Sequence, residues 1–169
     1  MGLEIAKDSI GWSEYLDGIA ADEANSFSAL IGFKMKTHPP VGLSAFYQQS
    51  SEEDQLLGYF ATGEPATTTV KFKAFGFDGT VYAPLSERLY LTGSLGLGFY
   101  TFTVNTSLGG SVSEDFTGFR AGLGFEYQIA DKFSVNAGFR YVGLFSNDNS
   151  GYDSVENLKE ATIGVKLYF

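Results

Sequence analysis

Apolar and polar residues alternate along most of this chain of 169 residues, in segments of about ten residues or more. The clearest segment is residues 119–128, where aromatic and aliphatic side chains lie on one face and Arg120, Glu126 and glycines lie on the other. Strict alternation predicts a β-strand with one apolar face. A soluble sandwich also alternates, but a polar face of charges interleaved with glycines is typical of a narrow lumen. A large aromatic face is typical of contact with lipid.

Eight segments are predicted as strands. Six alternate regularly: residues 27–36, 41–48, 89–100, 119–128, 133–141 and 161–169. The segments 3–15 and 67–82 are weaker. In the second of these, Val70 and Phe72 are expected to point outward and Lys71 and Lys73 inward, after which the parity changes. Such a change predicts a β-bulge near Ala74.

The connections between these segments fall into two classes. The turns 37–40, 83–88 and 130–132 are short, whereas the links 16–25, 49–66, 105–115 and 146–157 are long and polar. Alternating short turns and long loops describe an even-stranded barrel with both termini at the short-turn end. We therefore predict an all-β fold, an eight-stranded antiparallel up-and-down transmembrane β-barrel, as a single domain over residues 1–169.

The composition agrees with a closed sheet in a membrane. Charged residues make up only 18% of the chain, and there are no cysteines that could form disulfides or thiolate metal sites. Because no apolar run reaches the ~18 residues of a membrane helix, a chain that spans a membrane must pair its backbone in a closed sheet. An outer-membrane protein must be exported, so we expect that a signal peptide has been removed and that Met1 takes its place.

On these patterns the chain resembles the small eight-stranded bacterial outer-membrane barrels of the OmpA and OmpX type. The resemblance covers nearly the whole length and rests on pattern more than on identities. Its most specific feature is the C-terminus, where Thr162, Gly164, Leu167 and Phe169 match the family's assembly signal. Alternatively, Phe169 is simply the last lipid-facing residue of its strand. The resemblance implies a bacterial outer-membrane location, a monomer, contact with the lipid bilayer and lipopolysaccharide, and insertion by the barrel assembly machinery.

Charged residues on the polar faces are expected to line the lumen: Lys34, Lys36, Lys71, Lys73, Arg120, Glu126, Arg140 and Lys166, together with Asp78, Glu4 and Asp8. An eight-stranded barrel is nearly filled by side chains, so buried charges need partners. We expect an ion-pair network that plugs the lumen, as in the proteins that the chain resembles. A path for small anions, lined by the cations, is the alternative.

Acidic residues and no Lys or Arg occupy the four long links: Asp17, Asp22, Glu23, Glu52, Glu53, Asp54, Glu64, Glu114, Asp115, Asp148, Asp153 and Glu156. They supply much of the net charge of −9, which would repel nucleic acid and attract cations or basic partners. The links then form a solvated rim, or clustered carboxylates bind a divalent cation. Residues 147–151 are similar to a calcium loop, but Asn157 stands where an EF-hand needs Glu.

An apolar patch interrupts the second long link, at Leu56, Leu57, Tyr59 and Phe60. Exposed apolar patches mark contacts, so the patch is an adhesive tip or a lid, or else it extends the neighbouring hairpin. Trp12 is expected to anchor the chain at the membrane interface.

We expect no enzymatic activity and no cofactor. The only histidine, His38, lies beside two prolines in a short turn. The resulting hypothesis is a non-enzymatic barrel for envelope structure or surface contact through long acidic extracellular loops. The alternatives are a narrow channel for small solutes or hydrophobic molecules and a soluble barrel of the lipocalin type.

Overall fold

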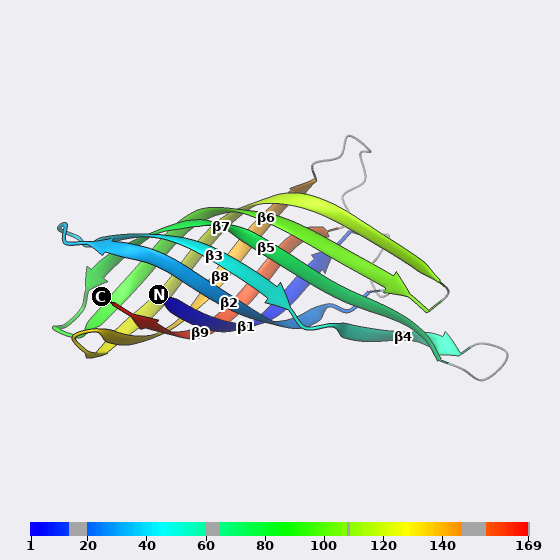
Figure 1. The fold of residues 1–169 in the computed structure, drawn as a ribbon, viewed down its shortest axis with the longest axis horizontal. Coiled ribbons are helices and arrows are strands. Elements are labelled where there is room, and N and C mark those ends of the chain that lie inside the picture. Colours follow the sequence, from blue (N-terminus) through cyan, green and yellow to red (C-terminus); the bar gives the residue numbers. More distant parts are fainter. Residues whose placement is uncertain (14–19, 60–64, 108, 147–154, 169) are drawn as a thin grey trace.

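A computed structural model describes residues 1–13, 20–59, 65–107, 109–146 and 155–168. Within these ranges the chain forms nine antiparallel strands (Figure 1). They are β1 (Gly2–Trp12), β2 (Glu23–Met35), β3 (Val41–Ser50), β4 (Glu53–Tyr59), β5 (Pro65–Pro84), β6 (Leu89–Thr106), β7 (Gly110–Ala130), β8 (Phe133–Ser146) and β9 (Val155–Leu167). None of the described residues belongs to a helix long and apolar enough to cross a membrane.

Eight of the strands close into a ring. Consecutive strands pair from β5 to β9, β9 pairs with β1, and β1, β2 and β3 follow. Pairing of β3 with β5 closes the ring, while β4 pairs with β5 alone. The Met1 amino group donates a hydrogen bond to the carbonyl of Leu167, so the described ends of the chain meet at the end where the short turns lie (Figure 1). The predicted eight-stranded antiparallel barrel is confirmed.

A band of exposed apolar side chains surrounds the outside of the ring. Leu123 is 69% exposed and Phe77 is 66% exposed, although both lie in the middle of long strands. Toward the long-link end the band finishes in outward aromatic residues on six strands: Phe27, Tyr47, Phe75, Phe99, Phe119 and Tyr141. Phe75 pairs in register with both Tyr47 and Phe99. Aromatic girdles of this kind border the lipid-facing band of membrane barrels.

Beyond this aromatic girdle the two faces of the sheet exchange polarity. On β5, Val70 and Phe72 are buried inside, and Lys71 and Lys73 lie on the outer face. The predicted inward lysines and the bulge near Ala74 are therefore wrong, because β5 pairs with β3 and β6 in continuous register. The strand passes from lipid to water between Phe75 and Lys73, so the environment outside the barrel changes while the alternation continues.

Two of the predicted long links contain additional sheet. Strands β5, β6 and β7 have 20, 18 and 21 residues, and β6 and β7 remain paired as far as Thr106 and Gly110. The predicted loop 105–115 is thus wrong: it is a tight hairpin, turned at Gly109 with a φ of 91°, which glycine adopts without strain. The link 49–66 contains β4. The sequence pattern does not predict these strand segments, because polar side chains lie on their outer face where a lipid-facing strand has apolar ones.

Candidate functional site

The lumen divides into three zones along its axis. The outer zone, at the long-link end, is apolar and consists of Ile10, Trp12, Val70, Phe72, Tyr100, Phe102, Phe116, Val142, Leu144, Val155 and Leu158. The ring of Phe102 contacts those of Phe72 and Phe116 at centroid distances of 5.2 and 5.7 Å. These inward aromatic side chains fill the lumen where water, not lipid, surrounds the barrel.

Trp12 belongs to this outer zone, so the prediction that it anchors the membrane interface is wrong. Its side chain is buried, and its indole nitrogen donates a hydrogen bond to the carbonyl of Ala21 at 3.0 Å. The ring packs edge-on against Phe102 at 6.4 Å. A buried tryptophan needs such a partner for its N–H group, and here the residue helps to close the barrel.

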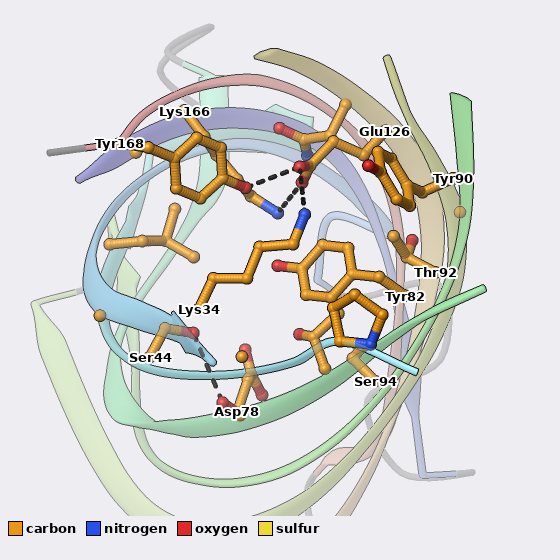
Figure 2. A pocket seen from close by; sticks show the side chains of 18 of the residues that line it. Lys34, Ser44, Asp78, Tyr82, Tyr90, Thr92, Ser94, Glu126, Lys166 and Tyr168 are labelled. Atoms are coloured by element: carbon orange, nitrogen blue, oxygen red, sulfur yellow. Dashed lines mark hydrogen bonds and ion pairs between the residues drawn. The ribbon is translucent and has the colours of Figure 1, made fainter. Parts of the chain in front are cut away.

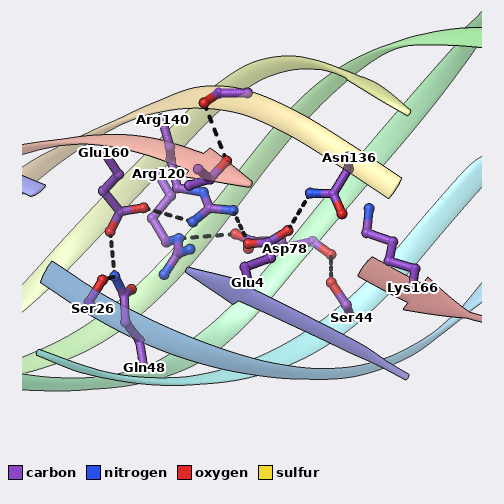
Figure 3. Close-up of polar contacts among 12 residues, drawn as sticks. Glu4, Ser26, Ser44, Gln48, Asp78, Arg120, Asn136, Arg140, Glu160 and Lys166 are labelled. Atoms are coloured by element: carbon purple, nitrogen blue, oxygen red, sulfur yellow. Dashed lines mark hydrogen bonds and ion pairs between the residues drawn. The ribbon is translucent and has the colours of Figure 1, made fainter. Parts of the chain in front are cut away.

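The middle zone is a set of buried ion pairs (Figure 3). Arg140 Nη1 lies 2.7 Å from a carboxylate oxygen of Glu160, and its Nη2 lies 3.2 Å from one of Glu4. Arg120, which is 2% exposed, pairs with Asp78 at 3.3 Å. One arginine therefore joins β8 to β1 and β9, and the other joins β7 to β5.

Polar contacts extend the middle zone across the lumen. Gln48 on β3 donates hydrogen bonds of 2.9 Å to Ser26 and to Glu160 on β9, as Figure 3 shows. The guanidinium of Arg120 lies 3.5 Å from the ring centroid of Phe46. Asp8 is fully buried but has no ion-pair partner within 4 Å among the residues described. Its neighbour in register across β1 and β9 is Glu160.

The inner zone, nearest the short turns, is centred on Glu126 (Figure 2). The Glu126 carboxylate is 1% exposed, lies 3.0 Å from Lys166 Nζ and accepts a hydrogen bond of 2.6 Å from the hydroxyl of Tyr168. Lys34 Nζ reaches it from β2 at 3.6 Å. Since three strands separate β2 from β7 in either direction around the ring, Lys34 spans the lumen from the opposite wall.

An open cavity of about 900 Å³ occupies the inner zone. It is lined by Lys34, Lys166 and Glu126, by the tyrosines 82, 90 and 168, and by hydroxyl side chains nearer the middle zone. The ammonium of Lys34 lies 3.8, 4.4 and 5.4 Å from the ring centroids of Tyr82, Tyr90 and Tyr168. Near Lys34 the site thus combines two ammonium groups, one carboxylate and three phenol rings. Further charged side chains line the same cavity: Glu4, Lys36, Asp78, Asp131, Lys132 and Arg140.

The structure brings together most of the charges that the sequence assigned to the lumen. Lys34, Arg120, Glu126, Arg140 and Lys166 lie inside and are paired. Lys36 follows β2 and is exposed at the mouth of the cavity. Lys71 and Lys73 are on the outer face, and Lys71 pairs there with Glu52 at 2.7 Å.

Sequence reasoning missed Glu160 and the tyrosines of the inner zone. Glu160 lies two residues before Thr162 and shares its face, so extending the predicted strand 161–169 backward would have found it. Tyr82 and Tyr90 lie on polar faces of predicted strands, and their rings pack edge-on across β5 and β6 at a centroid distance of 6.3 Å. Alternation assigns these tyrosines to the inner face, but it gives no signal that they gather around Lys34.

The C-terminal residues lie on β9, where the predicted strand is. The hydroxyl of Thr162 donates to the carbonyl of Gly138 at 3.3 Å, and Leu167 is exposed on the outer face. At Gly164 a Cβ atom would come within 2.6 Å of the Glu4 side chain, so glycine makes room for the middle zone. Phe169 lies outside the described residues, and the assembly signal stays a prediction.

The predicted surface patch lies on β4. Leu56 and Leu57 are 51% and 42% exposed; Tyr59 ends the strand, and Phe60 lies outside the described residues. Of the acidic link residues, six belong to strands: Glu23, Glu53, Asp54, Glu114, Asp115 and Glu156. Asp17, Glu64, Asp148 and Asp153 fall outside the described ranges. Those ranges contain no group of three or more His, Cys, Asp or Glu side chains that could hold a metal ion.

Comparison with solved structures shows that other barrels share this fold. Neisserial surface protein A (NspA) is similar, with a TM-score of 0.68 and 15% identity, over 99% of this chain and 95% of that one. Ail, the attachment invasion locus protein of Yersinia pestis, has a TM-score of 0.62 and 16% identity in its complex with the heparin analogue sucrose octasulfate, again over 99% and 95%. The outer membrane enzyme PagL has a TM-score of 0.53 and 8% identity, over the full length of both chains.

Sequence comparisons define the family. Comparison with curated proteins gave no match. The family model of the outer membrane protein beta-barrel domain, however, matches residues 2–169. The match agrees with the closed ring, the apolar band and the aromatic girdle, and it places the protein in the bacterial outer membrane. The chain therefore belongs to the outer membrane protein beta-barrel domain family.

Proposed function

We propose that this protein is a non-enzymatic outer-membrane barrel that makes surface contacts through strands that project beyond the membrane, around a closed lumen. The observation that carries the proposal is the projecting sheet, which we define as β4 with residues 65–72 of β5, 100–106 of β6 and 110–115 of β7. It lies beyond the aromatic girdle, at the end opposite the short turns (Figure 1). Because short turns face the periplasm in bacterial barrels, the projecting sheet faces the cell exterior.

The free edge of β4 gives the projecting sheet a means of binding. Strand β4 pairs with β5 on one side, and no other described strand pairs with its second side. Backbone N–H and C=O groups on such an edge can accept another extended chain. Leu56 and Leu57, which lie at a register shift against β5, add exposed apolar area to the same strand. This combination favours an extended peptide segment as the partner.

The charge of the residues near the free edge of β4 indicates the charge of the partner. Near the free edge lie Glu52, Glu53 and Asp54, and of these Glu52 is paired with Lys71 and Asp54 bonds the hydroxyl of Thr69. An acidic surface attracts basic partners and repels polyanions. The ligand in the Ail structure is a heparin analogue, a type of ligand that this surface would repel. We therefore infer a basic, extended peptide segment as the preferred contact.

The closed lumen is supported by the three zones described above. The outer zone is filled by apolar side chains, and the middle zone by two arginines with buried carboxylate partners. Eight strands enclose little more than the volume of their inward side chains. An ion-pair network together with an apolar seal favours a structural barrel over the alternative of a narrow channel.

The non-enzymatic part of the proposal rests on the position of the only histidine. His38 lies exposed in the turn between β2 and β3, at the periplasmic mouth, whereas the proposed contact surface is at the other end. The likeness to the enzyme PagL is a likeness of fold at 8% identity, and fold alone does not carry an activity.

The experiment measures binding of a short fluorescent peptide of alternating Lys and Val to the full chain, refolded in nanodiscs of zwitterionic phospholipid. We expect saturable binding, at least about tenfold weaker for a matched Glu and Val peptide. Leu57→Ser should weaken binding, because it removes apolar contact at the edge without changing the charge. The control Leu85→Ser changes an exposed leucine in a periplasmic turn and should leave binding unchanged. Equal binding of both peptides, or equal effects of both substitutions, would contradict the proposal.

A further inference from the structure

We propose that the cavity of the inner zone is a binding site for a small, hydroxyl-rich organic anion, such as a sugar acid or a sugar phosphate, which enters from the periplasm. The cavity measures about 900 Å³, within the range of small-molecule sites. It reaches the short-turn end, where Thr37, His38 and Asp131 line it, and Figure 2 shows its interior. This inference is independent of the contact surface proposed above, which lies at the other end of the barrel.

The balance of charge in the inner zone favours an anion. Five basic side chains line the cavity, those of Lys34, Lys36, Lys132, Arg140 and Lys166, against four carboxylates, those of Glu4, Asp78, Glu126 and Asp131. Lys166 and the Tyr168 hydroxyl already contact the Glu126 carboxylate at 3.0 and 2.6 Å. The chain as a whole carries a net charge of −9, whereas the lining of this cavity has an excess of positive charge. This local excess favours an anionic ligand.

Lys34 makes one long ion pair, and its ammonium group retains hydrogen-bond donors for a ligand. Its Nζ lies 3.6 Å from Glu126, which is longer than a charge-assisted hydrogen bond, and no closer acceptor lies among the described residues. Its side chain is 22% exposed and lines the cavity. An ammonium has three N–H donors, and a bound carboxylate or phosphate would satisfy them in a site that is only partly open to water.

The tyrosine rings hold Lys34 in position for this role. Cation–π contacts with Tyr82 and Tyr90, at centroid distances of 3.8 and 4.4 Å, hold the ammonium beside these rings. An organic cation could use the same rings only by displacing Lys34, whereas an anion can bind Lys34 where it is. The observed arrangement therefore favours an anionic ligand over a cationic one.

The side chains between the inner and middle zones indicate the chemistry of the uncharged part of the ligand. Ser44, Thr80, Thr92 and Ser94 line the cavity there, and Figure 2 shows three of them around its open centre. The Ser44 hydroxyl contacts the carbonyl of Asp78 at 3.5 Å. Hydroxyl side chains both donate and accept hydrogen bonds, which suits the hydroxyl groups of a sugar. The outer zone closes the far end, so the cavity holds a ligand and does not conduct it.

The test is calorimetric titration of the refolded full chain in nanodiscs with glucose 6-phosphate and glucuronate, with glucose as the neutral probe. We expect both anions to bind and glucose to bind at least about tenfold more weakly. Lys34→Gln should weaken binding of both anions by about tenfold or more. Tyr90→Phe, which keeps the ring and removes the hydroxyl, should retain the Lys34 position and bind within about threefold of the original protein.

Lys73→Gln is the matched control, because it makes the same charge change on the outer face of the barrel. It should not alter binding, and heat-dependent gel mobility should show that both lysine variants are folded. Absence of anion binding by the unchanged protein, equal loss in both lysine variants, or tighter binding of choline than of glucuronate would overturn the proposal. Binding of inorganic phosphate as tight as that of glucose 6-phosphate would also overturn it, since the sugar would then contribute nothing.

Discussion

At the scale of single residues, Arg140 makes the closest ion pair in the lumen. It joins β8 to the adjacent strand β9 through Glu160, and to β1, the next strand beyond β9, through Glu4. Such a pair is weak evidence for stability in itself, because both charges are removed from water. Removal of one partner is costly, however, since the remaining charge stays buried. Asp8 on β1 and Glu160 on β9 pair in register, and we expect them to differ in their contributions to the free energy of unfolding.

Glu160→Gln should lower the free energy of unfolding by about 3 kcal/mol, because Arg140 loses the closer of its two carboxylates. Asp8→Asn is the matched control: Asp8 is as buried as Glu160 and pairs with it in register, but it lacks an ion-pair partner among the residues described. We expect Asp8→Asn to be neutral or stabilising by up to about 1 kcal/mol. Urea titration in lipid vesicles measures both. Equal losses would contradict the assigned pairing.

The sequence allowed the charged residues of the lumen to be predicted only in part. Arg120, Glu126 and Arg140 were found because each stands on the polar face of a regular strand within the lipid band. Lys73 has the same alternation but lies beyond the girdle, where outside means water. Alternation fixes which residues share a face, whereas the neighbouring medium decides which face is inside. That medium depends on height in the membrane, which the local pattern does not contain.

At the scale of strands, Tyr100 shows how glycine shapes the lumen. A Cβ atom added at Gly118, its diagonal neighbour on β7, would come within 2.7 Å of the Tyr100 ring and 2.8 Å of Val142. Gly98, on the same strand as Tyr100, is equally close to the ring. The ring thus covers two glycines, which pair with each other in register. Large residues on the inner face need small ones beside them because the barrel is narrow.

Gly118→Ala should therefore destabilise the barrel by about 1–3 kcal/mol through overpacking. Gly93→Ala should change stability by less than about 0.5 kcal/mol. An added Cβ at Gly93, on the same β6–β7 pair, would meet only the end of the Leu123 side chain at 3.9 Å. Urea titration in vesicles measures both variants. A neutral result for Gly118→Ala would mean that the Tyr100 ring moves aside freely.

The reversal of polarity along β5 and β6 gives a second prediction at this scale. Phe77→Lys places a charge in the apolar band and should cost about 2–4 kcal/mol, as lysine does near the middle of a bilayer. Thr101→Lys places the same charge beyond the girdle, where Asp115 already bonds Thr101 at 2.7 Å, and should cost less than about 1 kcal/mol. Folding yield into vesicles and urea titration measure the difference. Similar costs would place the membrane boundary elsewhere.

The eight-stranded ring could be predicted because lipid imposes a regular pattern on every strand that crosses it. Strand ends outside the lipid were missed for the same reason. Residues 99–103 follow the same alternation, but polar side chains on their outer face gave the appearance of a loop. Residues 110–115 are exposed or half-buried throughout and show no alternation of burial. The site was predicted less well than the fold. Its tyrosines become a group only when β5, β6 and β9 are placed around one lumen, which is a consequence of ring closure.

At the scale of the whole molecule, the three zones follow one another along the barrel axis: the inner zone contains a cavity, and the middle and outer zones are filled by side chains. A solute that crosses the barrel must pass the ion pairs of the middle zone and the packed rings of the outer zone, whatever happens in the inner zone. Opening the inner zone alone should therefore not open the barrel. This separates the anion site proposed for the inner zone from the alternative of a channel, although both involve Lys34.

Planar bilayer recording tests this arrangement. The refolded protein, shown to be folded by heat-dependent gel mobility, should give no reproducible channels, and neither should Lys34→Gln. The physical reason is that Phe72, Phe102 and Phe116 still close the outer zone, where filled eight-stranded barrels leave no aqueous path. Reproducible channels in the unchanged protein would reject the closed lumen and favour the narrow channel. If Lys34→Gln then altered their conductance, the inner cavity would be the entrance to that channel and not a closed binding site.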